Sequence, residues 1–155
     1  MYNDMNKKLA ALLSESDYLI TNLSNASALL GEYLSDINWA GFYIVEGDRL
    51  FLGPFQGKTA CVNIPMGRGV CGTAAAKNET QLVKNVHEFP GHIACDACSN
   101  SEIVVPITVG GTVVGVLDID SPSLARFDEN DREGLEKAAE IIGKVWAKCP
   151  KAVGP

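Results

Sequence analysis

The start of the chain has the hydrophobic pattern of a helix. Between residues 7 and 34, apolar side chains recur at steps of three and four and mark one buried stripe. The stripe consists of Leu19, Ile20, Leu23, Ala26, Leu30 and Leu34. Residues 14–17 interrupt it, and Ser16 or Asp17 could cap the second part. The pattern predicts an N-terminal helical segment with a break at 14–17.

The middle of the chain is typical of strands, and the end is again helical. β-branched runs flank Gly110-Gly111, which is a hairpin signal. Asp128 resembles the N-cap of an amphipathic helix over 129–148. The other expected elements are a hairpin at 38–55, strands at 61–65, 80–86 and 101–120, and a short helix at 73–77.

This order predicts an α/β (α+β) fold. About six mostly antiparallel strands would form one sheet, with the N- and C-terminal helices on one face. The other face is left for loops that cover a ligand pocket. We expect residues 1–155 to form a single domain, with a tail at 149–155 that frays.

Composition and charge exclude several classes of function. The net charge of −6 opposes binding to nucleic acid, because an acidic surface repels phosphates. No apolar run reaches the ~20 residues that span a bilayer, and the start does not resemble a secretion signal. The sequence therefore predicts a cytoplasmic protein that binds neither nucleic acid nor membrane.

Five cysteines in such a protein suggest metal binding, redox catalysis or burial rather than structural disulfides. His92-x-x-Cys95-x-x-Cys98 could supply three zinc ligands, with a fourth from Cys61, Cys71 or His87. Zinc is not favoured, because such sites usually use two matched cysteine pairs. A thioredoxin-like role is also disfavoured, since this pair precedes a strand rather than opening a helix.

Gly67, Gly69 and Gly72 match the pattern G-x-G-x-x-G. A dinucleotide site would need a parallel strand before it, whereas the surrounding strands are expected to be antiparallel. A turn that requires glycine backbone angles is the favoured interpretation. Cys71 lies in this turn, near a helix start that could lower its pKa.

Three acids could form a cluster. Asp118 and Asp120 share one face of a strand, although a solvated strand end explains them equally well. Glu102 begins the partner strand. A regular hairpin with an even loop would turn it away, whereas a bulge would place it opposite Asp120. Clustered acids would raise at least one pKa and supply both a carboxylate for an ammonium group and a neutral proton donor.

Aromatic residues could form a small apolar pocket. Trp39, Gly41 and Tyr43 share one strand face, and Gly41 leaves a gap between two rings. Such a gap could hold a methyl-sulfur group, whereas ordinary core packing is the simpler explanation.

Together these residues resemble the free methionine-(R)-sulfoxide reductases, which are single GAF domains. The similarity runs from about residue 38 to the last helix. It is carried by INWAGFY, LGPFQGK, ACVNIP, GRGVCGTA, FPGHIACD, SEIVVPI, GVLDIDSP and RFDENDREGLE. The resemblance implies a GAF-like fold, no cofactor or metal, a homodimer, and an antioxidant enzyme that thioredoxin recycles.

The resemblance also implies residue roles. Cys95 matches the nucleophile, Cys71 the cysteine that resolves it as a disulfide, and Cys61 a third cysteine with a secondary role. Trp39 and Tyr43 match residues near the methyl-sulfur end of free L-methionine-(R)-S-oxide. Glu102, Asp118 and Asp120 match the acids that hold and polarise this substrate.

These roles predict a reaction sequence. Cys95 would attack the sulfoxide sulfur while Glu102 or Asp120 protonates the oxygen, which yields methionine and a cysteine sulfenic acid. Cys98 departs from the family pattern and could compete with Cys71 as the resolving thiol, and Cys149 is also extra.

The alternative to a reductase is a GAF module that senses a small ligand or a redox state without turnover.

Overall fold

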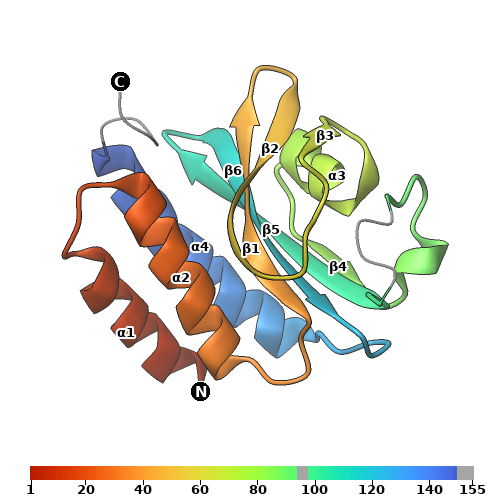
Figure 1. Cartoon of the computed structure of the whole chain (residues 1–155), viewed down its shortest axis with the longest axis horizontal. Coiled ribbons are helices and arrows are strands. Elements are labelled where there is room, and N and C mark those ends of the chain that lie inside the picture. The colour runs from red at the N-terminus through yellow and green to blue at the C-terminus, as the bar shows by residue number, and fades with distance from the viewer. Residues whose placement is uncertain (94–97, 150–155) are drawn as a thin grey trace.

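A six-stranded antiparallel sheet divides the molecule into two sides (Figure 1). The structure is a computed structural model that describes residues 1–93 and 98–149. The strand order is β3-β2-β1-β6-β5-β4. The strands are β1 (Trp39–Glu46), β2 (Arg49–Gly57), β3 (Asn63–Pro65), β4 (Gln81–Val83), β5 (Ser101–Val109) and β6 (Thr112–Ser121). The predicted fold class and the hairpins at Gly47-Asp48 and Gly110-Gly111 are confirmed.

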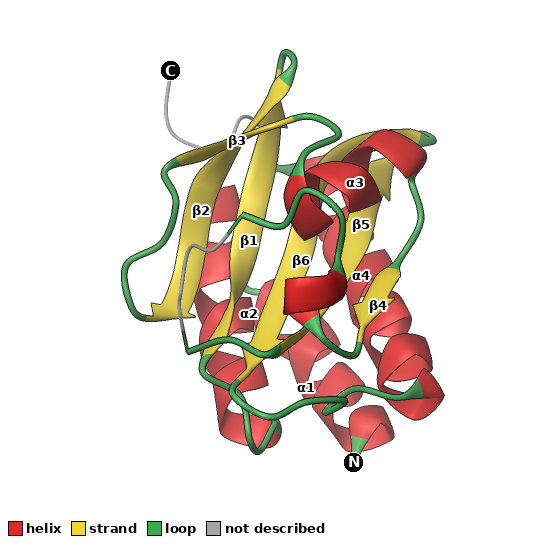
Figure 2. Ribbon diagram, turned by 90° about the vertical axis from the view of Figure 1, so that its right-hand side faces the viewer, coloured by secondary structure: helices red, strands yellow, loops and turns green. Residues whose placement is uncertain are grey.

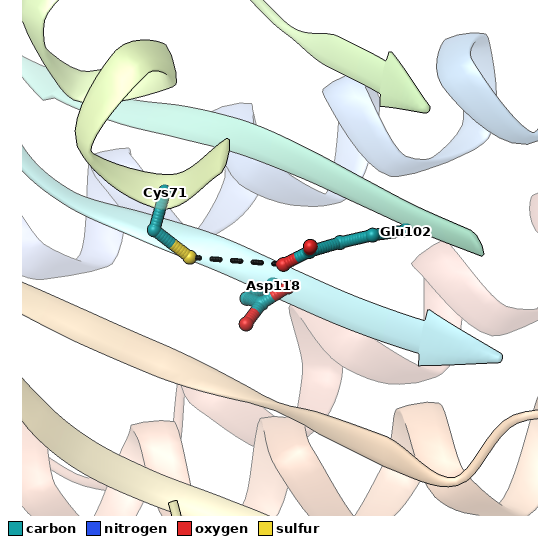
Figure 3. Close-up of side chains that lie close together, drawn as sticks. All are labelled: Cys71, Glu102 and Asp118. Carbon is teal, nitrogen blue, oxygen red and sulfur yellow. Dashed lines mark hydrogen bonds between the residues drawn. The ribbon is translucent and has the colours of Figure 1, made fainter. Parts of the chain in front are cut away.

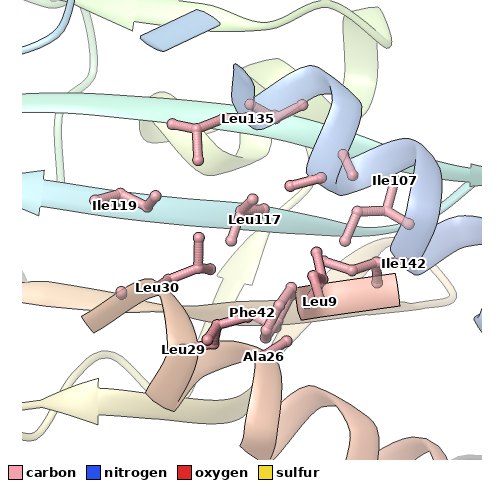
Figure 4. Close-up of a cluster of buried hydrophobic side chains, with 14 of the residues drawn as sticks. Leu9, Ala26, Leu29, Leu30, Phe42, Ile107, Leu117, Ile119, Leu135 and Ile142 are labelled. Carbon is pink, nitrogen blue, oxygen red and sulfur yellow. The ribbon is translucent and has the colours of Figure 1, made fainter. Parts of the chain in front are cut away.

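Three helices cover one face of the sheet: α1 (Tyr2–Leu13), α2 (Leu19–Tyr33) and α4 (Glu129–Lys148). The larger hydrophobic core lies between these helices and the sheet (Figure 4). The predicted break at 14–17 is confirmed, but the prediction that Ser16 or Asp17 caps α2 is wrong. Tyr18 is the N-cap and makes no side-chain cap bond, whereas the Ser16 hydroxyl accepts a hydrogen bond from the Tyr18 amide.

The start of α4 is fixed by acids. Asp128 is its N-cap, as predicted, and forms reciprocal hydrogen bonds with Asp131. The Tyr2 hydroxyl donates to the other oxygen of Asp131 at 2.7 Å, and Arg126 pairs with this acid at 3.3 Å. Asp131 therefore ties the first residues of α1 to the first turn of α4.

The opposite face carries α3 (Gly69–Lys77), the short 3-10 helix η1 (Val86–Glu88) and long loops (Figure 2). α3 begins four residues earlier than predicted, so Cys71 lies in a helix rather than in a turn. Gly67 and Gly69 have positive φ angles of 82° and 64°. β3 before them is antiparallel to β2, so the G-x-G-x-x-G segment is a tight turn and not a dinucleotide fingerprint.

The β5–β6 hairpin contains the irregularity that the acid cluster requires. The register shifts by one residue between Ile107 and Thr108, which places Glu102 opposite Asp120. The shift lies within the strands, because the loop itself is the two-residue turn of Gly110 and Gly111 with positive φ angles.

Within the described part of the chain, none of the helices combines the length and the apolar composition of a membrane span. Most of the tail that was predicted to fray, from residue 150 on, lies outside the described residues.

Candidate active site

Two rows of side chains run across the sheet on the face opposite α1, α2 and α4. One row consists of Trp39, Asp120 and Glu102, and the next consists of Gly41, Asp118 and Val104. Because side chains alternate along a strand, the residues between them point into the helical core. The register thus brings three acids from β5 and β6 beside the aromatic residues of β1.

A cavity of about 40 Å³ lies over these rows, which is room for only a few water molecules. The acids form its floor, and the aromatic rings and the first residues of α3 form its walls. The described lining residues are Trp39, Tyr43, Thr59, Ala60, Ile64, Arg68, Gly69, Val70, Cys71, His92, Ile93, Ser99, Glu102, Asp118 and Asp120. All five described residues of the predicted substrate site therefore line one cavity.

The acids are deeply buried. Glu102 is 7% exposed and Asp118 is 5% exposed, and the Cys71 thiol points at Glu102, with Sγ 3.9 Å from Oε2 (Figure 3). Burial raises the pKa of Glu102 well above its ordinary value, and the neighbouring Asp118 and Asp120 raise it further. Burial also raises the pKa of Asp118, but hydrogen bonds from its neighbours oppose this change. Of these two acids, Glu102 has the pKa that is raised more clearly, so its neutral form is the more favoured.

One carboxylate oxygen of the cluster has no partner within the described residues. It is Oδ1 of Asp118, which is shielded from solvent in the cavity floor. Leaving such an atom unsatisfied costs about 1–3 kcal/mol, so the arrangement is suited to a ligand that brings a hydrogen-bond donor. An ammonium group would satisfy both the oxygen and the negative charge.

The expectation of a lowered pKa for Cys71 is wrong. The thiol is buried, and burial together with Asp118, Glu102 and Asp120 raises its pKa well above the ordinary value. Cys71 lies in the first turn of α3, but the nearby carboxylates and desolvation outweigh the helix dipole. This thiol is therefore protonated near neutral pH and is a poor nucleophile.

The other cysteines differ in state. Cys61 is disulfide-bonded, whereas Cys71 and Cys149 are free thiols and Cys98 is an exposed thiol. Cys95, the predicted nucleophile, lies outside the described residues, so its expected disulfide with Cys71 is untested. The resolving role of Cys71 stays a prediction, and the disulfide-bonded state of Cys61 favours Cys61 as the resolving cysteine.

The aromatic residues pack as in an ordinary core, which was the simpler explanation of their pattern. Trp39 and Tyr43 stack with ring centroids 6.0 Å apart, and Phe55 stacks on Trp39 at 5.1 Å. A Cβ atom on Gly41 would lie 2.3 Å from the Cβ of Phe55, so this glycine makes room for β2 rather than for a ligand. The rings form a flat apolar wall of the cavity.

These rings also hold the loop that carries Cys61. The Tyr43 hydroxyl donates to the Cys61 carbonyl at 2.9 Å, and the Trp39 indole donates to the Lys58 carbonyl at 3.1 Å. Trp39 and Tyr43, which line the cavity, therefore also position the 58–61 segment.

Metal binding has only partial support. Ligand atoms of Cys71, Glu102 and Asp118 lie within 4.8 Å of one another, so they could hold a divalent ion. The zinc site weighed from His92, Cys95 and Cys98 includes a residue outside the described ones. His87, its possible fourth ligand, has its Nε2 atom 2.9 Å from Oδ1 of Asn100.

Sequence reasoning missed part of the cavity. Arg68 and Ser99 line it, but the sequence analysis gave neither residue a role. Arg68 stands inside the GRGVCG segment, where attention fell on the glycines and the cysteine. A cation beside a predicted helix start would have been a usable signal.

The fold and the pocket define a class of protein, namely a GAF domain. A family model described as "GAF domain" matches residues 21–147. A free methionine-R-sulfoxide reductase of Escherichia coli is 55% identical over 94% of this chain and 88% of that protein. A Saccharomyces cerevisiae protein of the same name is 54% identical over 81% and 74%. The free methionine-R-sulfoxide reductase of Neisseria meningitidis, solved in complex with its substrate, is 43% identical over 96% and 89%, with a TM-score of 0.93. The chain belongs to the free methionine-R-sulfoxide reductase family.

Proposed function

We propose that this protein reduces free L-methionine-(R)-S-oxide to L-methionine, as a single GAF domain of the cytoplasm. The observation that carries the proposal is the buried acid cluster beside an aromatic wall. It offers a neutral carboxyl, Glu102, next to an unsatisfied carboxylate oxygen, Asp118 Oδ1. This pair suits a substrate with a basic sulfoxide oxygen and an ammonium group.

The first chemical step uses Cys95 as the nucleophile. Its thiolate attacks the sulfoxide sulfur and forms an S–S bond while Glu102 gives a proton to the oxygen. The oxygen then passes to the Cys95 sulfur as the bonds from the substrate sulfur to oxygen and to Cys95 break. Methionine leaves, and Cys95 becomes a sulfenic acid. His92 lines the cavity three positions before Cys95 in the chain. Burial and His87 lower its pKa, so its neutral imidazole can accept the thiol proton.

The second step forms a disulfide, and we assign the resolving thiol to Cys61. Its sulfur attacks the sulfenic sulfur of Cys95, and water leaves. The assignment is supported by the disulfide-bonded state of Cys61 and by the raised pKa of the Cys71 thiol. An external dithiol protein such as thioredoxin then reduces the bond by exchange.

The test of the reaction is dithiol-dependent loss of free L-methionine-(R)-S-oxide, followed by chromatography. The (S) diastereomer and a peptide-bound sulfoxide are measured in parallel. We expect turnover of the free (R) form alone and near-complete loss in Cys95→Ser. Equal turnover of the peptide-bound form would refute the specificity.

Two variants separate the resolving roles. Cys61→Ser should release one equivalent of methionine per enzyme and then stop with thioredoxin as reductant. Cys71→Ser should keep multiple turnovers, because its buried thiol is not needed for exchange. If Cys71→Ser stops after one turnover and Cys61→Ser does not, Cys71 is the resolving cysteine, as the resemblance implies. If only Cys98→Ser stops after one turnover, Cys98 is the resolving cysteine.

The homodimer is also part of the proposal and is supported by the family resemblance. Light scattering during size-exclusion chromatography should give about twice the mass of one chain. A mass equal to one chain at assay concentrations would exclude a dimer as the working form.

A further inference from the structure

One stretch of the chain carries positive charge although the protein as a whole is acidic. Residues 49–78, called the basic segment below, contain four of the thirteen lysine and arginine residues and no aspartate or glutamate. The segment therefore has a net charge of +4, whereas the remainder of the chain, with nine basic and nineteen acidic residues, has −10. A partner that approaches the basic segment meets a local charge opposite in sign to that of the whole protein.

The basic segment folds into β2, β3, α3 and the connections between them. β3 pairs with β2 and α3 packs on β3, so the segment forms one continuous part of the molecule. Lys58, Arg68 and Lys77 are exposed, and the salt bridges within residues 1–93 and 98–149 include none of them. Arg49 donates to the Asn63 side chain at 2.9 Å. The three exposed cations can therefore attract acidic groups of a partner.

Cys61 lies in the connection between β2 and β3, which runs along the outer edge of the sheet (Figure 2). This connection is held from the inside, since the Tyr43 hydroxyl donates to the Cys61 carbonyl and the Leu52 amide donates to the Val62 carbonyl at 3.0 Å. The Val62 side chain is 72% exposed, the largest value among the exposed large hydrophobic residues of the described chain. The disulfide-bonded Cys61 is thus followed directly by an apolar side chain in solvent.

A protein reductant has to reach this disulfide from the outside. The cavity of about 40 Å³ has room for a few water molecules and not for a loop of another protein. Thr59 and Ala60 line the cavity, whereas Lys58 and Val62, on either side of the cavity-lining residues, do not line it and are exposed. The connection therefore separates the cavity from solvent and presents its outer side to a partner.

We propose that the basic segment is the docking surface of an acidic dithiol protein, which reduces the disulfide by attack on Cys61. The positive charge of the segment steers an acidic partner and its attacking thiolate toward this sulfur. Val62 supplies an apolar contact beside it. The proposal rests on the proposed function, which supplies the disulfide between Cys61 and Cys95.

The exchange is a two-electron reduction. The first thiolate of the partner attacks the Cys61 sulfur and forms an intermolecular disulfide, while the bond to Cys95 breaks and Cys95 leaves as a thiolate. The second thiol of the partner gives its proton to solvent and attacks the intermolecular disulfide. This step releases Cys61 as a thiolate and the partner as its own disulfide, so the nucleophile of the next turnover is freed first.

The test compares a protein reductant with a small one. Wild type and Lys58→Glu are assayed with a thioredoxin of net negative charge and, in parallel, with dithiothreitol, which needs no docking surface. Lys58→Glu should lower kcat/KM for thioredoxin about 3- to 10-fold at low ionic strength, and this difference should shrink at about 0.5 M salt. Turnover with dithiothreitol should stay within twofold.

Lys137→Glu is the matched control, because it makes the same change of charge at an exposed position of α4, on the other side of the sheet. It should change kcat/KM for thioredoxin by less than twofold. Val62→Ser should lower this value about 3- to 10-fold at every ionic strength, since it removes an apolar contact. The proposal is overturned if Lys58→Glu or Val62→Ser behaves like Lys137→Glu, or if either variant slows thioredoxin and dithiothreitol equally.

A thioredoxin whose second cysteine is replaced by serine should be trapped on the oxidised enzyme as an intermolecular disulfide. Peptide mass spectrometry should place this bond at Cys61, and a bond at Cys95 would overturn the attack on Cys61. Oxidation by hydrogen peroxide prepares the disulfide without the sulfoxide. If the sulfoxide failed to oxidise the enzyme but the peroxide-oxidised protein kept its dependence on Lys58, the proposed reaction would be refuted and the docking surface would stand.

Discussion

The position of Glu102 in the sheet decides its chemistry. A glutamate at a solvated strand end would be ionised at neutral pH. Here the bulge in β5–β6 turns it into a cavity beside two other acids, where burial raises its pKa and favours the protonated form. A protonated carboxyl is what a sulfoxide oxygen needs in order to leave.

Replacing Glu102 by glutamine should abolish most of the proton transfer while keeping the shape of the site. We expect kcat to fall by about 10²–10⁴, the range for loss of a general acid, with KM changed only a few-fold. Steady-state rates with the free (R)-sulfoxide measure both constants. Glu88→Gln, in the exposed part of η1, is the control and should retain full activity. An unchanged kcat in Glu102→Gln would assign the acid to Asp120.

The helical elements have a separate task, which is to close the core behind the sheet. α4 packs on β5 on the face opposite the cavity, and its first turn depends on the capping box of Asp128 and Asp131. The side chain of Asp128 is exposed and acts on local backbone groups, so its effect is confined to the helix end.

Asp128→Ala should therefore cost stability and spare the reaction. Loss of an N-cap is worth about 0.5–2 kcal/mol of the free energy of unfolding. Urea titration should show this decrease, whereas kcat/KM at 25 °C should stay within twofold. Asn130→Ala, which is exposed in the same turn, should change stability by less than about 0.5 kcal/mol. A large loss of activity in folded Asp128→Ala would show that α4 communicates with the cavity.

The sequence predicted which helices and strands exist better than it predicted the residues at which they begin and end. Strand-like runs on either side of turn glycines located the two hairpins, and apolar residues at steps of three and four located the long helices. The short α3 has no such stripe, and its first residues were assigned to a turn because of their glycines. Whether Glu102 joins the aspartates depends on one bulge, which no local pattern encodes, so the sequence left two registers open.

The whole molecule consists of two hydrophobic clusters separated by one sheet. The cluster on the helical side contains apolar residues of α1, α2, α4 and the inward faces of the strands. The smaller cluster lies around the cavity and includes Trp39, Tyr43 and Cys71 together with Val70 and Val104. The acids are inserted in this second cluster, so their desolvation is a cost that the rest of the fold offsets.

That cost should make the contribution of Glu102 to the free energy of unfolding fall as the pH rises. In the unfolded chain Glu102 ionises near its ordinary pKa of 4.5, whereas burial in the folded protein raises its pKa well above this value. Between these two pKa values the folded state binds more protons than the unfolded state, so the free energy of unfolding decreases with pH. Each such group contributes up to about 1.4 kcal/mol per pH unit. Below pH 4 both states are protonated and the contribution vanishes.

Glu102→Gln isolates the contribution of Glu102 ionisation to the free energy of unfolding, because glutamine resembles the protonated carboxyl and cannot ionise. The variant should match wild type in stability near pH 4 and exceed it increasingly at pH 6 and pH 8, by about 1 kcal/mol or more. Urea unfolding of both proteins at the three pH values gives the difference, in which the contributions of all other groups largely cancel. A difference that stays constant with pH would mean that Glu102 is ionised in the folded protein. The proton donor would then have to be sought elsewhere, since the same group cannot be charged at rest and acidic in the reaction.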